Sequence, residues 1–227
     1  MPKQPSKILD LGGGNGRGSI AYAEMGHELV IVDLASNLLD EVKQSAHGAG
    51  IIDRVDLYNN DVRDLPNLFP KPEFDVILCH NVLQYIDNIQ DVIPGIINCL
   101  NFNGIISLVS MNRYSEVYRE ILHELNPKAA ADKIDIDEYI SATFKEPIHL
   151  YTADELLSYF QDFDLAVEGQ FGIRCVNDYI SDDNIKEDPT FFSDLEQLET
   201  ELGKKYPYNL LARFFQLVIR KYEIKSI

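Results

Sequence analysis

The sequence predicts an α/β fold in which helices cover both faces of a parallel sheet. The first observation is a short apolar run, Ile8 to Leu11, that leads into four glycines and then an apolar helical segment. The second is a series of four further apolar runs, separated by helical patterns, up to about residue 110. Strands that alternate with helices through short links form doubly wound parallel sheets. We therefore expect one Rossmann-like α/β/α sandwich domain over residues 1–227.

Each strand and helix of the first half has its own signal in the sequence. Residues 28–33 (ELVIVD) form an apolar run that ends in an acid, and Ser36 is expected to cap the helix that follows. Residues 55–58 are a short third strand, and residues 74–79 (FDVILC) are apolar enough for a strand buried on both faces. A helix is expected over residues 86–100, and a fifth strand over residues 104–109.

The alternation breaks after residue 110. Residues 112–150 hold a charged helical pattern at 114–125 and a polar stretch, so we expect a lid-like insertion. Thr152 and Glu155 form a capping box that opens another helix, and residues 164–174 form a sixth strand. Residues 177–185 and 190–205 read as helical, and residues 209–220 are apolar enough for a last strand. The second of these helices places four apolar residues on one face, Phe191, Leu195, Leu198 and Leu202.

Bulk composition excludes several classes of protein. No apolar run approaches the roughly 18 residues of a membrane helix, and the sequence lacks a signal peptide, so we expect a cytoplasmic protein without membrane contact. Three scattered cysteines (Cys79, Cys99, Cys175) lack metal-ligand spacing and read as buried thiols.

A net charge of −17 argues against a general nucleic-acid binder. Residues 203–227 are basic, however, and they offer either a patch for an anionic substrate or a solvated face. The basic residues are Lys204, Lys205, Arg213, Arg220, Lys221 and Lys225, against the single acid Glu223.

The glycine loop is the strongest motif. Asp10, Gly12, Gly14 and Gly16 are spaced as acid-x-G-x-G-x-G, between a strand and a helix whose free N–H groups point at the loop. Glycines suit a tight turn whose backbone approaches a ligand closely. A dinucleotide fingerprint fails here, because Ser19 stands where the last glycine or alanine is needed. Asp33 ends the second strand roughly 20 residues later, where an acid accepts hydrogen bonds from both ribose hydroxyls.

The loop, read together with Asp33, resembles the first motif of the class I S-adenosylmethionine (SAM) methyltransferases. The resemblance implies that Asp61 accepts from the adenine amino group, although Asp61 alone would also fit a simple turn. It also implies an antiparallel seventh strand beside the sixth. His80, at the carboxyl end of the strand next to the first, is a candidate contact for the methionine end of SAM. The expected cofactor-binding residues are Asp10, Gly12, Gly13, Gly14, Gly16, Asp33, Leu34, Asn60, Asp61, Val62, His80 and Asn81.

The second half is more specific. Residues 171–180 (FGIRCVNDYI), 195–221 and 79–86 (CHNVLQYI) are similar to the bacterial tRNA 5-carboxymethoxyuridine methyltransferases. That family methylates the carboxylate of a modified wobble uridine, which implies SAM as cofactor, S-adenosylhomocysteine as product and tRNA as partner. A carboxylate is already ionised at pH 7, so we expect no catalytic base, only a cation to hold it. Arg174, Arg213 and Tyr179 lie in the matching segments and are the candidate acceptor-binding residues.

This sequence departs from that family in its first residues, since only Met1 to Ser6 precede the first strand. Family members carry a helical segment there, so we expect weak SAM binding if that segment covers the cofactor. Two tail histidines of the family are Asn177 and Gln216 here, and the insertion lacks the family's run of lysines.

Three alternatives remain beside the tRNA methyltransferase. The first is a methyltransferase of a small carboxylate or hydroxyl compound, which the acidic charge favours. The second is a SAM-binding protein without catalysis, and the third is an NAD-dependent oxidoreductase. We expect no metal site.

Overall fold

The computed structural model of the protein describes residues 5–141 and 145–222. The chain divides into two compact units. Unit 1 comprises Met1–Leu108, Tyr159–Glu168 and Val218–Ile227, and unit 2 comprises Val109–Ser158 and Gly169–Leu217. The expected insertion, 112–150, lies wholly in unit 2, where it is joined by 169–217.

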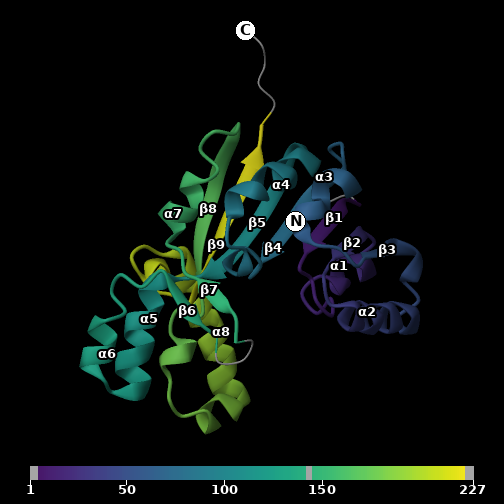
Figure 1. Ribbon diagram of the computed structural model, residues 1–227. Coiled ribbons are helices and arrows are strands. Elements are labelled where there is room, and N and C mark those ends of the chain that lie inside the picture. The colour runs from purple at the N-terminus through teal and green to yellow at the C-terminus, as the bar shows by residue number, and fades with distance from the viewer. Residues whose placement is uncertain (1–4, 142–144, 223–227) are drawn as a thin grey trace. The chain divides into compact units, whose positions relative to one another are not determined.

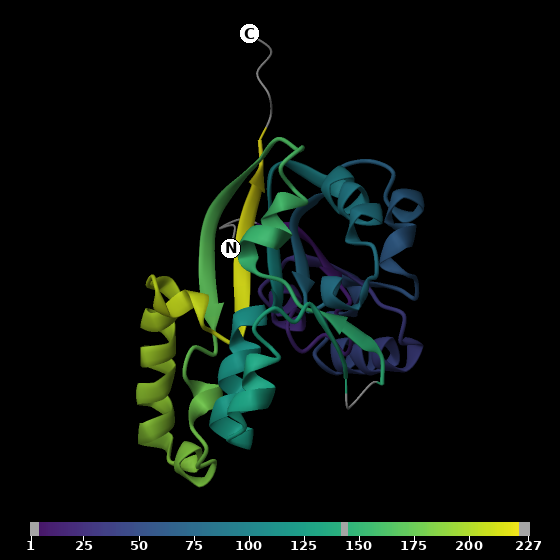
Figure 2. The same ribbon diagram turned by 60° about the vertical axis from the view of Figure 1, so that its left-hand side comes forward.

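Seven strands form one sheet, in the order β3-β2-β1-β4-β5-β9-β8 (Figure 1). β2 is parallel to both β1 and β3, and β1 is parallel to β4. Figure 2 shows β8 and β9 running in opposite directions, so the last strand is antiparallel and inserted beside β8. The predicted α/β fold with one antiparallel C-terminal strand is confirmed. The described strands are β1 (Lys7–Leu11), β2 (Glu28–Val32), β3 (Val55–Tyr58), β4 (Phe74–His80), β5 (Leu100–Met111), β6 (Glu138–Ile140), β7 (Pro147–His149), β8 (Leu165–Ile173) and β9 (Phe214–Lys221).

The helices are mostly short, and α2 and α8 are the longest of those described. α7 begins with the predicted capping box: Thr152 N–H donates to Glu155 Oε2 (2.8 Å), and Glu155 N–H donates to Thr152 Oγ1 (3.2 Å). The described α-helices are α1 (Ile20–Glu24), α2 (Ser36–Gly48), α3 (Leu65–Leu68), α4 (Ile93–Cys99), α5 (Arg113–Arg119), α6 (Pro127–Ala131), α7 (Ala153–Ser158) and α8 (Pro189–Lys204).

Unit 1 buries both faces of its part of the sheet. On one face, Ile8 of β1 and Ile31 of β2 pack with Val42 of α2 in a cluster of buried side chains that also includes α1. The alternate residues, such as Leu9 and Ile77, are also fully buried. Because successive strand residues point to opposite faces, helices or loops must cover both sides.

Three predicted boundaries and one predicted helix are wrong. The helix expected over 86–100 starts only at Ile93, because Pro94 suits a first helical turn, and β5 already begins at Leu100. Residues 177–185 form no α-helix, since this Asn- and Asp-rich stretch makes two short 3-10 turns, Asn177–Tyr179 and Asn184–Glu187. The last strand starts at Phe214, after a 3-10 turn at Tyr208–Leu210.

Ser36 does not cap α2. Ser36 is the first helical residue, and the N-cap is Ala35, whose methyl side chain has no group that could cap the helix. Instead, the side chain of Asp33 lies at the start of the helix, where its Oδ1 accepts the N–H of Ala35 at 2.7 Å. On α8, Leu195 is buried as expected, but Leu198 is 48% exposed, so the apolar face is only partly covered.

Unit 2 contains a small core of its own. Met111, Ile148 and Leu150 are buried together, with Tyr139 and Phe214 packed against them. An antiparallel pair, β6 with β7, lies in the insertion and was not predicted. The described part of the insertion therefore contains a strand pair and packs into a core, and its role as a lid stays a prediction.

Candidate cofactor-binding and acceptor-binding sites

The carboxyl ends of four parallel strands of unit 1 lie at the same edge of the sheet. Leu11 is opposite both Val32 and Cys79, and Val32 is opposite Tyr58. The expected cofactor residues after Asp10 follow these positions directly, in segments 12–16, 33–34, 60–62 and 80–81. The fold therefore brings them to the edge where open α/β sheets bind ligands.

The glycine loop has a backbone that other residues would strain. Gly12, Gly14 and Gly16 have φ values of +60°, +55° and +73°. A Cβ on Gly12 would lie 2.6 Å from Val82 Cγ2, and one on Gly13 would lie 2.5 Å from Asp10 Oδ2. The loop backbone thus packs so closely against neighbouring side chains that a Cβ would not fit at Gly12 or Gly13, which is typical of nucleotide-binding turns.

Asp33 organises the entrance of the loop. Its Oδ2 accepts the Gly14 N–H at 2.8 Å, and its Oδ1 accepts the Ala35 N–H at 2.7 Å. Each carboxylate oxygen has a second lone pair, so both can still accept a hydroxyl proton. Whether this half-buried carboxylate binds a ribose stays a prediction.

Asp10 is buried beneath this loop. Burial raises the pKa of its carboxyl to about 6, and the charge of Asp33 adds to the effect. The ionised carboxylate of Asp10 is therefore energetically unfavourable in the folded protein at neutral pH. Such a raised pKa in a ligand-binding region is typical of functional sites.

The segment after β3 holds the expected adenine contacts. Asp61 accepts hydrogen bonds from the backbone N–H of Arg63 (2.8 Å) and from its Nε (2.9 Å). Burial alone would raise the pKa of Asp61, but the hydrogen bonds from Arg63 hold it below the usual value. Asn60 contacts Asp64 at 3.4 Å, Val62 starts a 3-10 turn, and Leu34 after β2 is exposed. Asp61 thus stabilises a turn, and whether it also binds a base stays a prediction.

His80 ends β4, and Asn81 follows it with a left-handed backbone, φ +58°. His80 Nε2 lies 2.8 Å from Ser107 Oγ on β5. Burial lowers the pKa of His80, so the ring is neutral at pH 7. Its contact with the methionine end of SAM remains a prediction.

Sequence reasoning missed three residues of this edge: Asn59, Val82 and Ser107. Asn59 Nδ2 donates to the carbonyl oxygens of Asp33 (3.0 Å) and Leu34 (2.9 Å), and so ties two segments together. The only available signal was the pair of asparagines directly after a strand, which favours a turn.

The expected acceptor residues lie in unit 2, in a network of ion pairs. Arg213 is buried and pairs with Glu116 of α5, and its Nη1 donates to Ser115 Oγ at 3.1 Å. Arg174 pairs with Asp178, and Asp178 also lies 4.0 Å from Arg213 Nε. Neither acid was predicted. Glu116 lies 97 residues from Arg213 in the sequence, whereas Asp178 lies only four residues from Arg174 and is one of many acids in this region.

The guanidinium groups of Arg174 and Arg213 both contact the ring of Phe214. The Cζ atom of Arg174 is 5.8 Å from the centre of its ring, and that of Arg213 is 5.5 Å away. Guanidinium groups bind to aromatic faces at this range. The Arg174 side chain is nevertheless 50% exposed, whereas that of Arg213 is 9% exposed. Arg174 thus has N–H donors left for a ligand.

The backbone around Arg174 is held by Glu199 of α8, a third acid that was not predicted. Its carboxylate accepts N–H groups from Cys175 (2.6 Å), Val176 (2.9 Å) and Asn177 (2.6 Å). Arg174 itself has φ +60°, an uncommon conformation for a bulky residue. Strained residues persist where the surroundings over-determine them, and Glu199 supplies that constraint.

Tyr179 is anchored beside this network. Its hydroxyl donates to the Leu211 carbonyl at 2.8 Å, and its ring lies 6.2 Å from that of Tyr118. Burial raises the pKa of Tyr179 to about 12, so the phenol keeps its proton. Because its one proton is donated to Leu211, the Tyr179 hydroxyl can accept a hydrogen bond and its ring can make apolar contacts, but the phenol does not act as a base.

The basic C-terminal residues are mostly engaged. Lys221 donates to the carbonyls of Ile97 (2.8 Å) and Leu100 (2.7 Å) at the end of α4. Arg220 pairs with Glu168, and Lys204 is 3.6 Å from Glu201. Lys205 is exposed, and Lys225 lies outside the described residues. Lys221 could contribute to the expected patch for an anionic substrate only by giving up these two hydrogen bonds.

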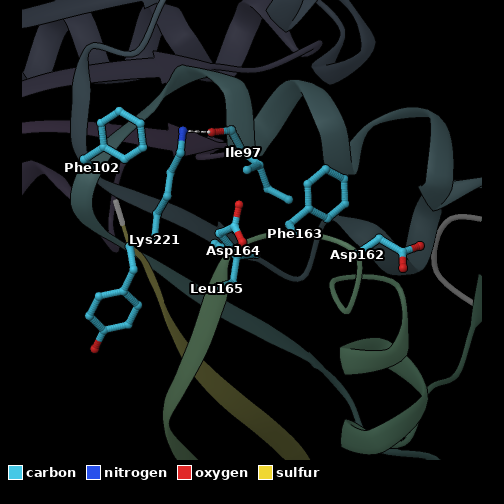
Figure 3. A pocket seen from close by; sticks show the side chains of 8 residues that line it. Ile97, Phe102, Asp162, Phe163, Asp164, Leu165 and Lys221 are labelled. Carbon is cyan, nitrogen blue, oxygen red and sulfur yellow. Dashed lines mark hydrogen bonds between the residues drawn. The ribbon is translucent and has the colours of Figure 1, made fainter. Parts of the chain in front are cut away.

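Unit 1 also has a cavity of about 440 Å³ beside Lys221. Figure 3 shows the Lys221 side chain extended toward the Ile97 carbonyl, with Phe102, Phe163 and Asp164 around the cavity. No expected cofactor residue lines it.

Within the part of the chain that the structure describes, no group of three or more His, Cys, Asp or Glu side chains could hold a metal ion. None of the described helices is long and apolar enough to cross a membrane.

Comparison with known proteins adds the following. The model of the methyltransferase domain family matches residues 2–167. The tRNA 5-carboxymethoxyuridine methyltransferase of Escherichia coli strain K12 is 25% identical over 233 residues, which cover 100% of this chain and 84% of that protein. A ubiquinone biosynthesis O-methyltransferase of Rickettsia canadensis is 22% identical over 112 residues, 49% of this chain and 45% of that one.

Solved structures share the fold. A SAM-dependent methyltransferase of Mesorhizobium loti aligns with a TM-score of 0.65 at 15% identity, over 97% of this chain and 94% of that one. The 1,6-didemethyltoxoflavin-N1-methyltransferase of Burkholderia thailandensis, solved with S-adenosylhomocysteine, aligns with a TM-score of 0.60 at 16% identity, over 97% and 72% of the two chains. At these identities the likeness concerns the fold alone.

Proposed function

The chain belongs to the methyltransferase domain family and is a SAM-dependent methyltransferase, and we propose that it methylates the carboxylate of 5-carboxymethoxyuridine in tRNA. One observation carries the proposal. The similarity to the bacterial enzyme of that activity extends over the whole chain, acceptor residues of unit 2 included. The similarity to the O-methyltransferases of ubiquinone biosynthesis covers only half of it.

Unit 1 would bind the cofactor. The lone pairs left on Asp33 would accept the ribose hydroxyls. The glycine loop, with positive φ at Gly12, Gly14 and Gly16, would let the protein backbone approach the cofactor closely. Asp61 and Val62 would meet the adenine, and His80 the methionine end. When bound, SAM supplies an electrophilic methyl group.

Unit 2 would bind the acceptor. An alkoxyacetate is ionised at pH 7 and needs no base, so the protein only has to hold and orient it. Arg174 is suited to this because its guanidinium is partly exposed and presents two parallel donors. Arg213 is engaged with buried Glu116 and would position the network rather than meet the acceptor.

The test is a transfer assay with SAM labelled in its methyl group. Three acceptors are compared: tRNA carrying 5-carboxymethoxyuridine, the same tRNA with unmodified uridine, and free phenoxyacetate as a small carboxylate. We expect label in the first alone, and mild alkali should release it as methanol, because the product is a methyl ester. Label in phenoxyacetate and none in tRNA would refute the proposal.

Arg174 variants test the acceptor contact. Arg174→Ala should abolish transfer and leave SAM affinity unchanged, and Arg174→Lys should rescue poorly, because a point charge lacks the two-pronged geometry. Arg54→Ala is the matched control, since Arg54 is an exposed arginine of unit 1 that hydrogen-bonds only the Gly26 carbonyl among the contacts described. Equal loss in both variants would contradict the assignment.

A small-molecule hydroxyl acceptor is the second candidate, favoured by the net charge of −17. Such an acceptor needs a general base, and neutral His80 would be the first to consider. With His80 as the base, the rate should rise until about pH 6.5, because burial holds the pKa of His80 below its usual value of about 6.5, whereas a carboxylate acceptor gives a rate that is flat above about pH 5.

A further inference from the structure

Three arginines and two acids of unit 2 form a continuous chain of ion pairs, which we call the arginine–carboxylate chain. Arg119 Nη1 lies 3.1 Å from Glu116 Oε2, and Glu116 also pairs with Arg213. Arg213 lies 4.0 Å from Asp178, which pairs with Arg174. With three positive and two negative charges, the chain carries a net charge of +1 within an acidic protein.

The excess positive charge is at the surface. The middle of the chain is buried, since the side chains of Glu116, Arg213 and Asp178 are only 3%, 9% and 10% exposed. The two ends reach solvent: the side chain of Arg119 is 39% exposed and that of Arg174 is 50% exposed. A buried acid fixes each exposed guanidinium without covering it, so both can bind an anion with little loss of side-chain entropy.

An exposed aromatic ring lies beside the chain. Tyr118 directly precedes Arg119 on α5, is 41% exposed, and has its ring 6.2 Å from that of Tyr179. Tyr179 follows Asp178 and is anchored through its hydroxyl on the Leu211 carbonyl. The Tyr118 ring therefore has a fixed neighbour on one side and solvent on another.

We propose that Tyr118 and Arg119 form a docking site for single-stranded RNA next to the acceptor nucleotide, with Tyr118 stacking on a base and Arg119 binding a phosphate. The inference rests on the proposed function, because Arg174 holds the acceptor carboxylate at the other end of the same ion-pair chain. A cationic surface with an exposed aromatic ring matches single-stranded nucleic acid, which offers a base face and a phosphate at each step. A small carboxylate would use Arg174 and would not need Tyr118.

Stacking is tested by the affinity for a fluorescent anticodon stem-loop with unmodified uridine at the wobble position, with S-adenosylhomocysteine present. Tyr118→Leu keeps an apolar side chain and loses the ring, so binding should weaken roughly 5- to 150-fold. Tyr118→Phe keeps the ring and should bind within about twofold of the original protein. Tyr222→Leu is the control, because Tyr222 is similarly exposed (45%) and lies in unit 1.

The phosphate contact is tested by salt dependence. Arg119→Gln should lower the slope of log K against log salt by about 0.7, the value for one contact to a single strand. Arg119→Lys should restore it, because a lysine serves as well as an arginine for a phosphate. Arg54→Gln removes one charge elsewhere and should leave the slope unchanged.

These outcomes separate the inference from the proposed function. The inference is overturned if Tyr118→Leu binds the stem-loop as tightly as Tyr118→Phe, if Arg119→Gln keeps the full slope, or if the unsubstituted protein does not bind the stem-loop. The proposed function depends instead on label transfer to 5-carboxymethoxyuridine, which the binding experiment does not measure. Thermal unfolding of each variant excludes loss of fold as the cause of weaker binding.

Discussion

Glu199→Gln probes how the backbone around Arg174 is held. The carboxylate accepts three N–H groups, from Cys175 (2.6 Å), Val176 (2.9 Å) and Asn177 (2.6 Å). A glutamine side chain keeps one acceptor oxygen and turns an NH₂ group toward the remaining N–H. At least one hydrogen bond to a charged group is therefore lost, and a donor faces a donor.

The stability effect follows from these bonds. A hydrogen bond to a charged group contributes about 1.5–3 kcal/mol. For a chain of this size each kcal/mol shifts Tm by about 2–4 °C, so we expect Tm to fall by roughly 3–12 °C. Circular dichroism melts measure this. Glu201→Gln is the control, because it removes the same charge from an exposed position of the same helix.

The functional effect should be confined to the acceptor. Without the hydrogen bonds to Glu199, Arg174 is free to leave its left-handed backbone conformation, φ +60°, and its guanidinium loses its fixed direction. We expect kcat/KM for the tRNA acceptor to fall at least tenfold, while calorimetry shows unchanged SAM affinity. If Glu199→Gln melts and turns over like Glu201→Gln, Glu199 does not position Arg174 and the reasoning fails.

Three further outcomes concern unit 1. Asp33→Ala should weaken SAM binding at least about tenfold in calorimetry, since each lost hydrogen bond to the charged carboxylate contributes about 1.5–3 kcal/mol, and NAD should give no heat with either protein. Gly12→Ala places a Cβ 2.6 Å from Val82 Cγ2 at φ +60°, so Tm and SAM affinity should both drop. Gly18→Ala should change neither, because a Cβ at Gly18 would meet no atom within 4 Å. Burial raises the pKa of Asp10 to about 6 in the folded protein, so the folded state binds this proton more tightly than the unfolded chain. The contribution of Asp10 to the free energy of unfolding should therefore fall by about 3 kcal/mol as the pH rises from about 4 to about 6. Urea titrations of the original protein should show this fall, and those of Asp10→Asn should lack it.

The strands of unit 1 were predictable because each is a buried apolar run of the length that a strand needs. Residues 28–32 and 74–80 illustrate this, since they are apolar on both faces and leave no helical alternative. Helix ends were less predictable, because a hydrogen-bonding side chain other than the expected one lies at the start of the helix. Ser36 looked like an N-cap, but Asp33, three residues earlier, accepts the N–H of Ala35.

The glycine loop and Asp33 could be proposed as a cofactor site from their spacing, because both belong to one short stretch of chain. The acceptor side could not, because its chemistry depends on pairs distant in sequence. Arg213 pairs with Glu116, 97 residues away, and Glu199 holds the backbone of residues 175–177. Nothing local to these acids separates them from the many other acids of an acidic protein.

The two arginines of unit 2 illustrate how burial divides roles that sequence alone leaves equal. Both lie in segments similar to the tRNA methyltransferases, and the guanidinium group of each contacts the Phe214 ring. A buried pair such as Arg213–Glu116 costs several kcal/mol when one partner is removed, because the other charge is left without compensation. An acceptor carboxylate at Arg213 would therefore have to compete with Glu116 inside the protein. At Arg174 the competitor is Asp178, but half of the guanidinium side chain is already in solvent. The less costly exchange is at Arg174, and for that reason we assign the acceptor to Arg174 and the ordering of the network to Arg213.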